Sequence, residues 1–189
     1  MEILTYVIIA GYAICVAQAI YSLTTKKAVL GNFALAALLV AFVSQSVWLA
    51  QRGITTGRCP LVGTQETTAF LSWCLVVAYV VAQRWYHTAS LKAFVFPLVF
   101  VLATIAAIVP GVPGTPASIQ APLPRFLLPV HVGLIMLAYS AFFISFGAGL
   151  MYIVQERELK LKRFGTVFQK LPSLDTCDAI SFKSIAVGF

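Results

Sequence analysis

The sequence predicts an all-α fold, a polytopic transmembrane helical bundle of about five spans with the amino terminus outside. Three observations support this prediction. Of the 189 residues, 60% are hydrophobic and only 10% are charged, and the mean hydropathy is +0.93. A soluble domain carries about 25% charged residues, because its surface faces water. Five apolar runs have bilayer length, and lysine and arginine gather on one side of them.

The first span, 3–23, is not a cleavable signal peptide, because Glu2 precedes it and no A-x-A cleavage pattern appears. The second, 28–50, and the fourth, 91–109, contain the apolar runs FALAALLVAFV and FVFPLVFVLATIAAIV, which do not alternate as barrel strands do. The third, 67–83, is the shortest and has few polar groups. The fifth, 127–154, is long enough to tilt, and the helix-prone QERELKLKRFG after it predicts that the helix continues past the lipid.

We treat residues 1–189 as a single integral membrane domain. Residues 155–178 form a predicted cytoplasmic segment, and residues 179–189 begin a sixth span. Orientation follows from lysine and arginine, because positively charged loops tend to stay in the cytoplasm. The loops 51–66 and 110–126 hold three of these residues and are expected outside, whereas the other side holds ten. The ten are Lys26, Lys27, Arg84, Lys92, Arg157, Lys160, Lys162, Arg163, Lys170 and Lys183, and the three are Arg52, Arg58 and Arg125.

Charge and cysteine spacing argue against two other classes of function. The net charge is +7, but most of the surplus lies in one predicted cytoplasmic loop, where topology and anionic lipid headgroups account for it. No basic and aromatic residues interleave on a soluble face, so no nucleic-acid partner is expected. The four cysteines form no C-x-x-C motif, so neither a metal cluster nor a redox dithiol is indicated. They are Cys15, Cys59, Cys74 and Cys177.

Two histidines are present, so any imidazole chemistry depends on one of them. His87 falls at the cytoplasmic end of the third span in RWYHTASLK, an ordinary interfacial composition that favours a structural role. His131 follows Pro129 at the exterior start of the fifth span. A half-buried imidazole at that depth needs a partner, and a metal is one such partner. Spacing alone leaves a structural and a ligating role for His131 equally open.

Glu66 opens the third span and has two compatible interpretations. A carboxylate in the first turn interacts favourably with the helix dipole, with Thr64 as a cap. Alternatively, Glu66 pairs with Arg52, Arg58 or Arg125 and shapes an exterior pocket. Arg58 and Arg125 can also hold an anionic ligand through forked hydrogen bonds, although a simple loop role suits Arg125 as well.

Three segments carry a family resemblance: GRCPLVGTQETTAFLSW at 57–73, LLPVHVGLIMLAYSA at 127–141 and LPSLDTCDAISFKSIAVGF at 171–189. The first is similar to G-[HR]-x-P-x-x-N-x-[YF]-E-S-x-x-F-L-S-W and the second to W-x-x-x-H-V-x-x-x-x-x-x-Y-A. Both patterns, in this order, are typical of the CcsA/ResC-type cytochrome c assembly proteins of system II cytochrome c biogenesis, a family with HemX-like relatives. The chain resembles this family from Trp48 onward. The matching residues are Gly57, Pro60, Glu66, Phe70, Leu71, Ser72, Trp73, His131, Val132 and Tyr139.

The resemblance implies a multi-pass protein of the bacterial inner (plasma) membrane that binds haem b. Haem would be presented at the exterior, periplasmic face for attachment to apocytochrome c, with a CcsB/ResB-type membrane partner. His131 would be the haem axial ligand, and Glu66, Arg58, Trp73 and Tyr139 would form the haem pocket. Such attachment needs positioned haem and reduced thiols more than an acid–base pair. No catalytic residue is therefore assigned, and whether the chain is an enzyme, as part of a haem-lyase complex, stays open.

The sequence also departs from the family. The tryptophan-rich W-G-x-x-W-x-W-D segment and the second periplasmic histidine are absent, and Arg58 stands where some relatives have a membrane histidine. A helix beginning near Ala179 would have about ten residues, too few to cross a bilayer. We therefore expect the sequence to be the amino-terminal part of a longer protein. The alternative function is a HemX-like membrane regulator or scaffold of haem metabolism, for which the absent segment is no loss.

Overall fold

The computed structural model describes residues 2–24, 31–56, 61, 63–86, 88, 90–111, 127–162 and 168–189, and most of these residues are helical. Within these residues no strand occurs, and the all-α prediction is confirmed. The elements are α1 (Glu2–Thr24), α2 (Gly31–Thr56), α3 (Thr64–Tyr86), α4 (Lys92–Ile108), α5 (Leu127–Lys160), the short 3-10 helix η1 (Phe168–Lys170) and α6 (Leu174–Gly188).

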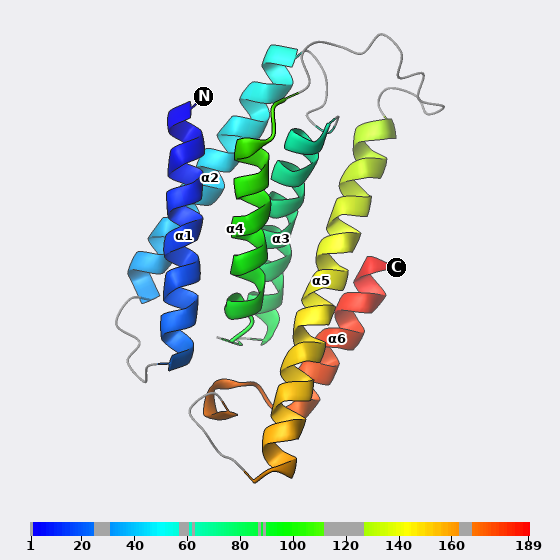
Figure 1. Ribbon diagram of the computed structural model, residues 1–189. Helices are drawn as coiled ribbons and strands as arrows, with labels where there is room; N and C mark the ends of the chain where they lie inside the picture. The colour runs from blue at the N-terminus through cyan, green and yellow to red at the C-terminus, as the bar shows by residue number, and fades with distance from the viewer. Residues whose placement is uncertain are drawn as a thin grey trace.

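The lengths of these helices suit a multi-pass membrane protein. Helices α1, α2, α3 and α5 are long and apolar enough to cross a bilayer. Helix α4 is also apolar, and its 17 residues span about 25 Å. Helix α5 has 34 residues, about 51 Å, and extends beyond α3 and α4 at the lower end in Figure 1.

Helices α1 to α4 form one group, and α5 and α6 form a pair beside it (Figure 1). Helix α1 packs against α2 and α4, α3 packs against α4 and α5, and α6 packs mainly on α5. Successive helices run in opposite directions, so the N-termini of α1, α3 and α5 share one end with the C-termini of α2 and α4. We call this the Glu2 end, and the opposite end the Lys92 end.

Small residues set the spacing of α1 and α2. A Cβ on Gly11 would lie only 2.7 Å from the Cβ of Ala41. Any side chain at position 11 would therefore push the two helices apart, as at other membrane helix crossings built from small residues. The core of the helix group is otherwise apolar, with fully buried residues that include Leu75, Val95 and Val99.

Local sequence determines where α3 and α6 begin. Gly63 has a φ of 103°, a conformation that favours glycine, and its carbonyl accepts a hydrogen bond from the Thr67 amide at 3.0 Å. Ser173 is the N-cap of α6, because its hydroxyl accepts a hydrogen bond from the Thr176 amide at 3.3 Å. Helix α6 thus begins at Leu174, before the sixth span expected from residue 179, and it lies alongside α5.

The first half of α5 differs from the second half. None of the residues from Leu127 to Tyr139 is buried, whereas the buried residues of α5 all lie between Ser140 and Gln155. A Cβ on Gly133 would meet nothing within 4 Å. The Glu2 end of α5 therefore has little cover from the described part of the chain.

Candidate functional site

Helices α2 and α3 present two different sides at the Glu2 end. Gln45, Trp48 and Arg52 recur on α2 at spacings of three and four residues, so they share one side of that helix. This side faces α1 and α4. Leu49 and Gly53 lie on another side of α2 and line a cavity that extends to the start of α5.

A buried ion pair joins α2 to α3 on the side that faces α1 and α4. Arg52 Nε donates to Glu66 Oε1 at 3.1 Å, and the two side chains are 18% and 1% exposed. Glu66 lies in the first turn of α3, so it both pairs with an arginine and interacts with the helix dipole. Gly111 lies three residues after the end of α4 at Ile108. A Cβ on Gly111 would overlap Arg52 Nη2 and Gln65 Oε1. Glycine at 111 therefore lets the backbone approach Arg52.

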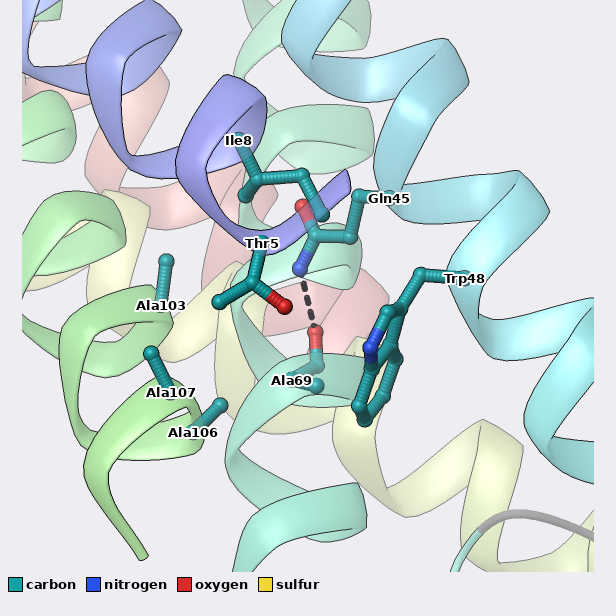
Figure 2. Close-up of a pocket in the computed structure, with 8 residues that line it drawn as sticks. All are labelled: Thr5, Ile8, Gln45, Trp48, Ala69, Ala103, Ala106 and Ala107. Carbon is teal, nitrogen blue, oxygen red and sulfur yellow. Dashed lines mark hydrogen bonds between the residues drawn. The ribbon is translucent and has the colours of Figure 1, made fainter. Parts of the chain in front are cut away.

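Deeper on the same side, Gln45 connects α1, α2 and α3. Its Nε2 donates to the Ala69 carbonyl at 2.7 Å and to the Ser72 hydroxyl at 2.6 Å, and the Tyr12 hydroxyl donates to its Oε1. Figure 2 shows the amide of Gln45 pointing from α2 toward Ala69. Gln45, Tyr12 and Ser72 are all buried. We call the five side chains Tyr12, Gln45, Arg52, Glu66 and Ser72 the polar core.

Two hollows adjoin the polar core. The smaller, about 20 Å³, lies between Thr5, Gln45, Trp48 and alanines of α4 (Figure 2), and its volume suits one water molecule. The larger, about 450 Å³, shares Thr5 and Trp48 with it, so the two are adjacent. Glu2, Thr5, Tyr6, Ile9, Trp48, Arg52, Gln65, Ala107 and Ile108 line the larger hollow.

The other side of α2 and α3 holds an apolar cavity of about 500 Å³, which we call the aromatic pocket. Trp73 stacks with Phe42 and Phe70, with ring centroids 5.3 and 5.9 Å apart, and its Nε1 donates to Ser46 Oγ at 2.9 Å. The volume lies in the range of about 300 to 1,000 Å³ that is usual for ligand sites. The lining residues are Ser46, Leu49, Ala50, Gly53, Ile54, Leu61, Phe70, Trp73 and Pro129.

The residues predicted from the sequence to form one site lie in different places. Trp73 lines the aromatic pocket, whereas Glu66 pairs with Arg52 in the polar core, about two helical turns away along α3. His131 and Tyr139 lie on the first half of α5, and both are exposed. Arg58 lies outside the described residues.

His131 and the aromatic pocket are on different sides of α5. Pro129 lines the pocket, and a helix turns by about 100° per residue, so His131 leaves the helix about 200° further around. Tyr139 lies about 12 Å along α5 from His131 and about 80° around it. The imidazole is therefore accessible from outside the helix group and does not point into the aromatic pocket.

The remaining sequence candidates add no metal or redox centre within the described residues. His87, Arg125 and Cys59 lie outside those residues. The described residues contain no group of three or more histidine, cysteine or acidic side chains that could hold a metal ion. Cys15, Cys74 and Cys177 are free thiols and are buried. Burial raises the pKa of the Cys177 thiol, which keeps it protonated and unreactive.

Sequence analysis missed Gln45 and Tyr12, and it did not single out Arg52 from the other arginines as the partner of Glu66. One signal was available. Gln45 is a strongly polar residue within an apolar span, and its spacing to Arg52 places both on one side of a helix. Ser72 matched a family pattern without a role, and the structure places it in the polar core.

Comparison with known proteins identifies the family. The family model described as Cytochrome C assembly protein matches residues 61–189, more than half of the chain. The chain belongs to the cytochrome c assembly protein family. This confirms the resemblance found in the sequence.

Three curated relatives are similar over most of this chain. Protein HemX of Brevibacillus brevis is 28% identical over 152 residues, which cover 80% of this chain and 55% of the relative. Protein HemX of Bacillus subtilis (strain 168) is 26% identical over 158 residues, covering 84% and 57%. Cytochrome c biogenesis protein CcsA of Guillardia theta is 25% identical over 167 residues, covering 80% and 56%. The chain thus spans about half the length of these relatives. No solved structure matches it significantly.

Proposed function

We propose that this protein handles haem in cytochrome c biogenesis, with His131 as an axial ligand of the haem iron. The observation that carries the proposal is the exposed imidazole of His131, on a stretch of α5 that has no buried residue. Membership of the cytochrome c assembly protein family supports the process. The distribution of lysine and arginine supports an exterior position for the Glu2 end, where haem could meet an apocytochrome c.

The surroundings of His131 suit a flat apolar ligand. Leu127, Val130, Leu134 and Leu137 are between 39% and 62% exposed, so a porphyrin ring laid on α5 would remove apolar surface from solvent. Histidine imidazole is one of the side chains that serve as axial ligands of haem iron. Haem is cargo in this proposal, and the chain's residues bind and orient it for addition of cysteine thiols across its vinyl groups.

The other predicted site residues take different parts in the proposal. Tyr139 would meet only the edge of a ring centred on His131, because it lies about 12 Å along the helix. Trp73 and Pro129 line the same pocket, so Trp73 would position the helical turn that bears His131. Glu66 would hold α3 against α2 through Arg52. Arg58 would pair with a haem propionate, as guanidinium groups do with carboxylates.

The ligand assignment is tested by a cavity variant with chemical rescue. The parent protein and His131→Gly are purified in detergent, and haem content and the Soret band are recorded. We expect His131→Gly to retain at most about one tenth of the haem that the parent retains. Added imidazole should restore the parent spectrum. His87→Gly removes the other imidazole and should leave both readouts unchanged. Equal haem and equal spectra in the parent and His131→Gly would refute the assignment.

The two HemX relatives favour a second candidate function. In this alternative, the protein is a membrane regulator or scaffold of haem metabolism that does not attach haem covalently to another protein. The two functions are separated in a host that lacks its own cytochrome c assembly proteins and expresses this protein with a CcsB/ResB-type partner and a reporter apocytochrome c. Covalent haem on the reporter supports assembly. A change in cellular haem without covalent haem on the reporter supports the regulator.

A further inference from the structure

Another apolar hollow lies between α3, α5 and α6, away from both the polar core and the aromatic pocket. Its volume is about 210 Å³, and we call it the α6 cleft. Val77 and Tyr86 mark the two ends of its α3 side, Leu137 belongs to α5, and Lys183 and Val187 belong to α6. Voids larger than a water molecule are few in a packed interior. A hollow of this size between membrane helices is therefore a candidate ligand site.

The α6 cleft has a charge at one end only. Lys183 Nζ lies 5.6 Å from the centroid of the Tyr86 ring, and the lysine is exposed. Among the described residues, no carboxylate forms an ion pair with Lys183. Trp85 is 64% exposed beside Tyr86, and tryptophan and tyrosine are enriched at the depth of lipid headgroups. From Tyr86 the cleft extends along α3 to Val77, about 13 Å deeper.

We propose that the α6 cleft binds an anionic phospholipid of the surrounding bilayer. One acyl chain lies in the apolar part of the cleft, and the lipid phosphate pairs with Lys183. The Tyr86 ring holds the ammonium group at the mouth of the cleft through a cation–π contact. Ser184 also lines the cleft, and its hydroxyl can donate to the phosphate. The predicted orientation turns this end toward the cytoplasmic leaflet, which carries the anionic lipids.

The proposal is tested by native mass spectrometry of the whole chain in detergent with added phosphatidylglycerol or phosphatidylcholine. We expect phosphatidylglycerol adducts to dominate, and Lys183→Gln to lower them by roughly tenfold, since a hydrogen-bonded charge pair is lost. Lys160→Gln is the matched control, because Lys160 is an exposed lysine at the same end of the bundle, paired with Glu156 at 2.7 Å. It should leave the adducts unchanged.

Further arms identify the ligand and keep the test decisive. Inorganic phosphate should not displace the lipid, because the acyl chain supplies much of the contact. Ala141→Phe fills the cleft and should lower binding of both lipids; if it does not fold, the two lysine variants decide alone. Equal losses in Lys183→Gln and Lys160→Gln, equal binding of phosphatidylcholine, or displacement by phosphate would each overturn the proposal. The Soret band of Lys183→Gln should match the parent, so the outcome is independent of the haem proposal.

Discussion

The two sides of the α2–α3 pair differ in polarity and in packing. Toward α1 and α4, the side chains of Gln45, Ser72 and Glu66 are buried and partnered, and the hollow beside Gln45 holds only about 20 Å³. Toward α5, aromatic rings border a cavity of about 500 Å³. In lipid the hydrophobic effect does not drive helices together, so close packing and polar contacts between helices fix the pairing. One side therefore sets the geometry, and the other is left free for a ligand.

The largest effect is expected from breaking the ion pair of the polar core. Glu66→Gln leaves the Arg52 guanidinium without its charged partner in a site where it is 18% exposed. We expect a loss of about 3 kcal/mol in the free energy of unfolding, at the lower end of the cost of a broken buried pair. Unfolding of the detergent-solubilised protein, followed by helical signal, measures it.

Two further variants sharpen this prediction. Glu156→Gln breaks the exposed pair with Lys160 on α5 and should leave the free energy of unfolding without a measurable change. The double variant Arg52→Met with Glu66→Met should recover most of the loss, because the cost comes from an uncompensated charge and not from a missing contact. A Glu66→Gln protein as stable as Glu156→Gln would mean that the polar side does not fix α2 against α3.

A smaller loss is expected at Gln45. Gln45→Leu removes the acceptor of the Tyr12 hydroxyl and the donor to Ser72 and to the Ala69 carbonyl. We expect the free energy of unfolding to fall by about 1 to 2 kcal/mol. This is at the upper end of the range for hydrogen bonds between membrane helices, because several such bonds are lost together. Tyr12→Phe should cost less, and the double variant less than the sum of the two. Strict additivity would show that Tyr12 and Gln45 are not coupled.

Much of the fold follows from the sequence, because apolar runs of bilayer length leave helices as the natural solution. The site follows only in part. Glu66 was expected to pair with one of three arginines, but Arg52 is selected by the rotation of α2 against α3, which composition does not encode. Likewise, Trp73 and His131 lie in motifs that suggest a shared pocket. Two residues of helical rotation past Pro129 turn His131 away from that pocket, and only the three-dimensional arrangement reveals this.

The smallest effect is expected on the aromatic side, where Ser46→Ala removes the acceptor of the Trp73 indole N–H. Trp73 is only partly buried and borders an open cavity, so its N–H can turn to water or a lipid headgroup when Ser46 is lost. We expect a loss of about 0.5 kcal/mol, measured by the same unfolding experiment as Gln45→Leu. The tryptophan emission should shift only slightly, because the stacking with Phe42 and Phe70 remains. If Ser46→Ala costs as much as Gln45→Leu, the aromatic side is as closed and as structural as the polar side, and it is not available to a ligand.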